Sequence, residues 1–255
     1  MKSLLEEKIT TFLIFLTIIL AIAFLVYYSI NSNIQNYKYS DKEEYEDVER
    51  GLNFIKKLPI HFNILNSSFH DMNTLKQEEK EQILVGYYLK NGMVEDCKDR
   101  EEDICISEEN LKKEKVFEKF NTKINFKSNK LNIYLDGYGL ETLYKKKSNN
   151  TTYYQMHIKE EKDVYAMFTS FKYFKKSKDS YNFYVYQGYY NRNNVNQYEL
   201  KDLIKDKVIY KEDVRNELFE HITDKEIKQL QLYKYILKKN KNGEYYLYGF
   251  TPVKS

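Results

Sequence analysis

Two cysteines and four histidines are the side chains of this sequence most able to act as nucleophiles, bases or metal ligands. Cys97 and Cys105 are separated by only seven residues in the segment DCKDREEDIC. In an exported domain a pair this close is expected to form a local disulfide, with two free thiols as the alternative. A zinc site takes four ligands at short spacings, whereas the histidines are scattered, at His61, His70, His157 and His221. We therefore predict a disulfide, and no catalytic residue, metal site or cofactor.

The segment around these cysteines is acidic. Residues Glu95–Glu109 carry eight acids against two bases. Three alternate acids, the last of them Asp103, match part of a calcium-binding loop. However, Ile104 stands where the turn glycine belongs and Asn110 where the bidentate glutamate belongs. A solvated acidic loop is the better interpretation.

Three lysines stand among aromatic residues in the segment FKYFKK: Lys172, Lys175 and Lys176. Basic surfaces that carry aromatic side chains bind single-stranded nucleic acids and other polyanions. The formal net charge of the chain is only +3, so bulk charge does not favour nucleic acid as a partner. An anionic wall polymer is the polyanion expected outside the cytoplasm. The alternative is that these lysines protect a sheet edge from aggregation.

The clearest structural signal is an apolar run from Thr10 to Ile30. No charged residue occurs between Lys8 and Lys38. At about 1.5 Å per residue, a helix of this length crosses the hydrocarbon core of about 30 Å. A cleaved signal peptide is the alternative, but its apolar core would be shorter, at about 7–15 residues.

Positive charge lies on the N-terminal side of this run, at Lys2, Lys8 and the α-amino group. The positive-inside rule therefore favours a cytoplasmic N-terminus and an exported C-terminal part. The expected location is the cell membrane, as a single-pass protein whose residues 10–30 contact the lipid bilayer. The predicted segments are a cytoplasmic tail (1–9), a transmembrane signal-anchor (10–30), a juxtamembrane helix (31–58) and an extracytoplasmic domain (59–255).

Capping patterns predict three helices ahead of the strands. Ser40 and Glu43 form a capping box, and the helix behind them should end before Pro59. A second capping pattern begins at Thr74 and a third at Ser107, each followed by apolar residues at helical spacing.

After Thr122 the apolar residues alternate, which predicts strands to the end of the chain. The last two strands flank an Asn-Gly turn signal within 240–243, the pattern of a tight hairpin. This order predicts an α+β fold: an N-terminal transmembrane helix, then helices packed on a curved antiparallel sheet, with cystatin-like and NTF2-like cones as analogies. The expected strands are 124–126, 131–135, 154–158, 164–174, 181–190, 207–210, 232–239 and 244–250.

The order of these features carries one resemblance. A lysine-flanked anchor, a helix, the Cys97-x7-Cys105 loop, a Ser107-capped helix and tyrosine-rich strands follow one another. In this organisation the chain resembles uncharacterised single-pass membrane-anchored extracytoplasmic proteins of low-GC Gram-positive bacteria. The resemblance implies export and a bacterial origin, and it implies no activity and no site residues.

The sequence therefore predicts a membrane-anchored extracytoplasmic binding or interaction module that is not an enzyme. Its expected partner is an envelope protein or an anionic wall polymer. The alternative is a cell-envelope-directed hydrolase or transferase whose acids are spread along the chain. A pocket with a histidine–acid pair or two facing acids would favour the enzyme, and an open sheet face would favour binding.

Overall fold

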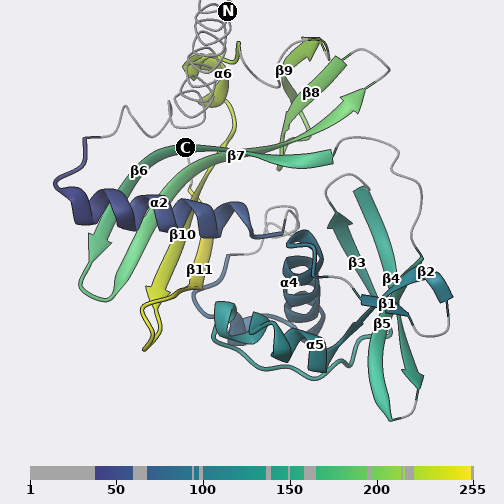
Figure 1. Ribbon diagram of the computed structural model, residues 1–255. Coiled ribbons are helices and arrows are strands. Elements are labelled where there is room, and N and C mark those ends of the chain that lie inside the picture. The colour runs from purple at the N-terminus through teal and green to yellow at the C-terminus, as the bar shows by residue number, and fades with distance from the viewer. Residues whose placement is uncertain are drawn as a thin grey trace, which may run out of the picture. The chain divides into compact units, whose positions relative to one another are not determined.

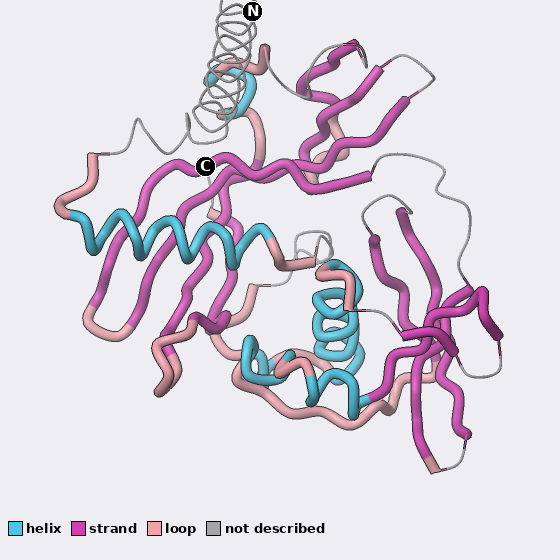
Figure 2. Tube along the Cα trace, in the orientation of Figure 1, coloured by secondary structure: helices cyan, strands magenta, loops and turns pink. Residues whose placement is uncertain are grey.

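The computed structural model describes residues 38–59, 68–93, 95–97, 100–135, 139–148, 150–157, 165–193, 197–213, 215 and 221–253 (Figures 1 and 2). The predicted membrane helix at residues 10–30 and the tail before it lie outside these residues. Within the described part of the chain, every helix is too short or too polar to cross a bilayer. Asp41–Ser255 forms one compact unit, which contains both sheets and all the described helices.

A six-stranded antiparallel sheet occupies the C-terminal half of this unit (Figure 1). Its central strand is β7, which pairs with β6 along one edge. On the other edge of β7, residues 181–187 pair with β10 and residues 188–193 with β8. The strands are β6 (Tyr165–Ser177), β7 (Ser180–Asn193), β8 (Gln197–Asp202), β9 (Val208–Asp213), β10 (Gln231–Lys239) and β11 (Tyr245–Pro252).

A second antiparallel sheet has five strands in the order β1-β2-β5-β4-β3. Its inward residues alternate with exposed ones, as Leu131, Ile133 and Leu135 do in β3. The strands are β1 (Glu95–Cys97), β2 (Arg100–Ser107), β3 (Lys130–Leu135), β4 (Gly139–Ser148) and β5 (Thr151–His157).

The helices begin close to the predicted caps. Asp41, one residue after the predicted Ser40, caps the first helix, because its Oδ1 accepts from the Glu44 backbone N–H at 2.8 Å. Ser107 caps its helix as predicted, with Oγ accepting from the Asn110 N–H at 3.1 Å. The α-helices are α2 (Lys42–Lys56), α4 (Gln77–Lys90), α5 (Glu108–Lys113) and α6 (Asp224–Ile227), and the 3₁₀ helices are η1 (Met72–Thr74) and η2 (Val116–Phe120).

The predicted fold class, helices packed on one curved antiparallel sheet as in a cystatin-like or NTF2-like cone, is wrong. Strands dominate the described residues and form two separate antiparallel sheets. One source of the error is the acidic segment, which forms β1 and β2 instead of a solvated loop. The other is β4, which was not predicted as a strand; three consecutive lysines follow its alternating part.

An ion-pair cluster at Asp47 fastens α2 to the six-stranded sheet. The Asp47 side chain is buried, and its Oδ1 accepts from Lys239 Nζ at 2.7 Å and from Tyr245 Oη at 3.0 Å. Burial raises the pKa of this carboxyl, but the hydrogen bonds from Lys239 and Tyr245 outweigh burial and lower it overall. One turn later, Gly51 allows close approach, since a Cβ there would lie 2.0 Å from Phe183 Cζ. The helix and the sheet are therefore in direct contact.

Candidate functional site

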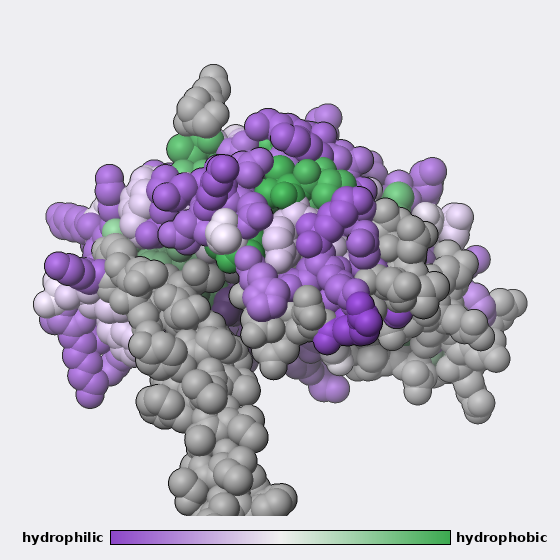
Figure 3. Space-filling model, turned by 90° about the horizontal axis from the view of Figure 1, so that it is seen from above, coloured by the Kyte–Doolittle hydropathy of each residue, from purple (hydrophilic) through white to green (hydrophobic). Residues whose placement is uncertain are grey.

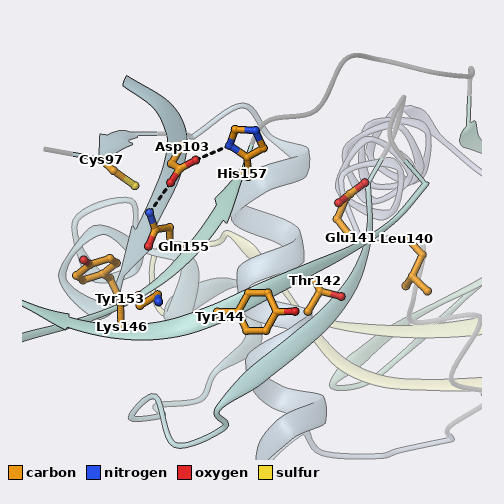
Figure 4. A pocket seen from close by; sticks show the side chains of 10 residues that line it. All are labelled: Cys97, Asp103, Leu140, Glu141, Thr142, Tyr144, Lys146, Tyr153, Gln155 and His157. Carbon is orange, nitrogen blue, oxygen red and sulfur yellow. Dashed lines mark hydrogen bonds and ion pairs between the residues drawn. The ribbon is translucent and has the colours of Figure 1, made fainter. Parts of the chain in front are cut away.

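An open cavity of about 690 Å³ lies on the outer face of the five-stranded sheet (Figure 4). Successive side chains of a strand point to opposite faces, so Tyr153, Gln155 and His157 of β5 reach this face while Tyr154 points inward. Side chains from β1, β2, β4 and β5 line the cavity: Cys97, Asp103, Leu140, Glu141, Thr142, Tyr144, Lys146, Tyr153, Gln155 and His157.

A histidine held by a buried carboxylate is the most chemically defined part of the cavity. Asp103 lies directly opposite His157 in the β2–β5 register, and its Oδ1 is 2.8 Å from His157 Nδ1. The other carboxylate oxygen accepts from Gln155 Nε2. Asp103 is only 3% exposed, whereas the His157 side chain is 61% exposed. With Nδ1 donating to the carboxylate, the imidazole is oriented and its Nε2 is left as the acceptor.

Exposed apolar side chains gather at the same cavity. The described surface seen in Figure 3 is mainly hydrophilic, with small hydrophobic areas. Three large apolar side chains are exposed in the described part of the chain: Tyr144 (56%), Leu140 (54%) and Ile204 (39%). Tyr144 and Leu140 both line the cavity. In Figure 4 they lie along β4, across from Asp103 and Gln155. The β4 wall of the cavity thus carries two apolar side chains beside polar ones, and the wall formed by β2 and β5 is polar.

The inner face of the sheet fixes the strand that carries the polar wall. Glu81 of α4 is buried and accepts a hydrogen bond from Tyr154 Oη, whose neighbours Tyr153 and Gln155 line the cavity. Glu81 also accepts from the backbone N–H of Lys127 at 2.8 Å. Burial raises the pKa of Glu81, but the hydrogen bonds outweigh it and lower the pKa overall. Burial and the neighbouring carboxylate raise the pKa of Tyr154, which therefore donates as a neutral phenol.

One of the two cysteines lies at the wall of this cavity. Cys97 and Cys105 are joined by a disulfide, with a Cα–Cα distance of 5.0 Å. Cys97 itself lines the cavity. Glu95 of β1 pairs with Cys105 of β2, so the bond links two strands that are already hydrogen-bonded. It ties the edge strand to the strand that bears Asp103.

The lysines singled out in the sequence do not share one surface. All three are exposed residues of β6. Lys172 and Lys175 both lie over the Tyr173 ring, at 5.7 and 5.4 Å from its centroid. Lys176 points to the other face, where its Nζ is 2.9 Å from Glu43 and 3.4 Å from Asp47 of α2. Lys176 is thus part of the attachment of α2 and is removed from the candidate polyanion site.

The Asp103–His157 pair was missed in the sequence. Asp103 was assigned to a solvated acidic loop, and His157 was considered only as a metal ligand. The two residues are 54 positions apart, and no local spacing signals their contact. An alternation of outward polar residues in Thr151–His157 and Arg100–Ser107 was the one available signal, and it is weak. In the described residues, no three His, Cys, Asp or Glu side chains are grouped as a metal site.

The cavity can accept hydrogen bonds, donate them and stack an apolar surface on a tyrosine ring. With His157 oriented by Asp103, it can also place a general base beside a bound ligand. The chain matches no protein-family model, no curated protein and no solved structure with which it was compared, so its own residues carry the functional argument.

Proposed function

We propose that this chain is a membrane-anchored extracytoplasmic binding module, and that its ligand is a saccharide unit of the cell envelope. The binding site is the open cavity on the five-stranded sheet. The observation that carries the proposal is the meeting there of two exposed apolar side chains, Tyr144 and Leu140, with the fixed polar group of Asp103, Gln155 and His157.

The chemistry of a pyranose fits these two walls. A sugar ring has an apolar face of C–H groups, which packs on the face of an aromatic ring. Its hydroxyl groups radiate from the edge, where planar side chains such as Gln155 and an oriented imidazole donate and accept hydrogen bonds. Ligand sites in general combine an apolar lining with a few placed polar groups. The cavity is open and formed by a sheet face, which suits a unit within a longer chain.

The Asp103–His157 pair favours a second candidate, a cell-envelope-directed hydrolase. In that case His157 Nε2 acts as a general base toward a bound water, while Asp103 stabilises the imidazolium that forms. Two carboxylates, Asp103 and Glu141, also line the cavity. The two functions differ in one outcome, since an enzyme converts the ligand and a binding module returns it intact.

The test is a calorimetric titration of the full chain, solubilised in non-ionic detergent, with oligosaccharides of N-acetylglucosamine. Replacing Tyr144 by Ala should weaken binding by about threefold to tenfold, the equivalent of about 0.5–1.5 kcal/mol for a ring contact. Ile204→Ala is the matched control, because Ile204 is exposed but does not line the cavity. Equal affinities of the wild type, Tyr144→Ala and Ile204→Ala would show that the cavity is not the saccharide-binding site.

The same samples separate binding from catalysis. Mass spectrometry of the oligosaccharide after prolonged incubation should show an unchanged chain length. Shortened products that disappear in His157→Ala would establish the hydrolase in place of the binding module.

A further inference from the structure

The six-stranded sheet carries a second polar surface, on the face turned away from α2. Phe183 and Tyr245 point toward α2, so the alternate residues of the same strands point away from it. This surface, the lysine–tyrosine face, consists of Lys172, Lys175, Lys234, Lys238, Tyr173, Tyr184, Tyr186 and Tyr248. It spans β6, β7, β10 and β11.

Each lysine of this face lies against an aromatic ring. Lys238 Nζ is 3.5 Å from the centroid of Tyr248, the closest of these contacts. Lys172 lies 5.2 Å from Tyr186, and Lys234 lies 6.0 Å from Tyr184. Tyr173 and Tyr184 stack with centroids 4.1 Å apart. Cation–π contacts of this kind hold the ammonium groups close to the sheet and leave their charge in place.

The charge of this face is not neutralised from within the described residues. None of its four lysines has a described carboxylate within ion-pair distance of its Nζ, in contrast to two lysines on the opposite face. There, Lys176 bonds Glu43 and Asp47, and Lys239 bonds Asp47 at 2.7 Å. The lysines on the α2 side are therefore ion-paired within the protein, whereas the lysines of the opposite face can form ion pairs with an external anion.

We infer that the lysine–tyrosine face binds a flexible phosphodiester polymer, of the kind found as anionic polymers in cell envelopes. The charge complementarity is direct, since four ammonium groups frame the rings and phosphate oxygens are their natural acceptors. The spacing suits a chain, because β6 and β10 are two strands apart, or roughly 10 Å, and Lys234 and Lys238 are four residues apart along β10.

The shape of the face favours a polymer over a planar bilayer. The register shifts in β6 between Phe171 and Tyr173. It shifts in β11 at Tyr248, which lies between the partners of Ile236 and Leu237. Such bulges bend a strand and increase its twist. A flexible chain can follow a twisted face down to lysines that lie on the rings, whereas a flat layer of headgroups touches only part of it.

The experiment measures binding of poly(glycerol phosphate) to the full chain in non-ionic detergent at two salt concentrations. For a single-stranded polyanion, the logarithm of the binding constant falls with the logarithm of the salt concentration by roughly 0.7 per neutralised phosphate. With about four phosphates neutralised, affinity should fall about 50-fold between about 50 and about 200 mM salt. Lys172→Gln/Lys175→Gln should reduce that loss to about sevenfold. The quadruple Gln variant should lose measurable binding, and the quadruple Arg variant, which keeps the charge, should retain it.

The matched control replaces four other exposed lysines by Gln: Lys205, Lys207, Lys225 and Lys228. This control has the same net charge as the quadruple Gln variant and should bind as the wild type does. Equal losses in both variants would show that bulk charge alone binds the polymer and would overturn the inference. Binding to phosphatidylglycerol vesicles without binding to the polymer, or binding that is insensitive to salt, would overturn it as well.

Discussion

Replacing Glu81 by Gln tests whether the buried carboxylate holds the five-stranded sheet on α4. Glu81 is 0% exposed and accepts four hydrogen bonds. Oε1 accepts from the Gln77 side chain and the Lys127 N–H, and Oε2 accepts from the Ser128 N–H and from Tyr154 Oη. A glutamine has one acceptor oxygen, so its NH₂ group must face two of these donors.

The expected loss of unfolding free energy depends on which donors find another acceptor in the variant. Tyr154 Oη also lies 2.8 Å from the Ser128 carbonyl oxygen, so its single proton can turn to that carbonyl if Gln places its NH₂ at the Oε2 position. The Ser128 N–H then loses its acceptor, and the remaining hydrogen bonds become weaker because the acceptor is no longer charged. A buried donor left unsatisfied costs about 1–3 kcal/mol, so we expect a total of about 2–4 kcal/mol.

Urea unfolding of the full chain in non-ionic detergent, followed by circular dichroism, measures this cost. With a slope of about 2–3 kcal/mol per molar for a domain of this size, the midpoint should fall by about 1 M. Glu78→Gln is the control, because Glu78 is exposed on the same helix. Equal midpoints for Glu81→Gln and Glu78→Gln at neutral pH would refute the reasoning.

The effect should depend on pH in a defined direction. The pKa of Glu81 is lowered in the folded state, so its ionised form stabilises the fold fully above the unfolded pKa of about 4.3. That contribution is lost as the pH falls through the folded pKa, where protonated Glu81 resembles Gln. The difference in unfolding free energy between wild type and Glu81→Gln should therefore shrink in acid, and a constant difference would contradict the assignment.

Three further predictions concern the attachment of α2, the disulfide and the topology. In urea unfolding, Gly51→Ala should destabilise the fold by about 1–3 kcal/mol through overpacking against Phe183, although a Gly-to-Ala change usually stabilises a helix. The control Asn53→Ala, at an exposed position of α2, should be neutral or mildly stabilising. Cys97 and Cys105 should alkylate only after reduction, and mass spectrometry that finds both labelled beforehand would refute the bridge. A reporter active only outside the cytoplasm, fused to the C-terminus, should be active; protection of the domain from protease added to spheroplasts would contradict the orientation.

Local signals in the sequence predicted the last hairpin and the Ser107 cap. They placed the other two helix starts within two residues, since Asp41 stands at the N-cap of α2 in place of Ser40 and Lys76 at that of α4 in place of Thr74. Side-chain caps act within three residues, and Ser107 caps its helix in the structure as predicted. The turn 240–243 likewise joins β10 and β11, with Gly243 at φ 77°. These features depend on neighbouring residues alone, and for that reason sequence reasoning reached them.

The site depends on contacts that are distant in sequence. Asp103 and His157 meet only because β2 pairs with β5, and that pairing depends on how the strands are arranged in the sheet. The lysines show a related effect. Lys175 and Lys176 are neighbours on opposite faces of β6, and the register shift near Lys172 brings Lys172 onto the same face as Tyr173. A bulge that moves a side chain to the other face carries no clear sequence signature.

The central claim, that the cavity on the five-stranded sheet is a saccharide site, is tested most directly by the histidine rings. The chain has four histidines, so a ¹⁵N-histidine-labelled sample gives few signals, and His157 can be assigned by its loss in His157→Gln. Titration with an N-acetylglucosamine oligosaccharide should shift the His157 ring nitrogens, with the same affinity that calorimetry gives, and leave His70 and His221 unchanged. Binding measured by calorimetry without a shift at His157, or with shifts only at the other histidines, would contradict the account.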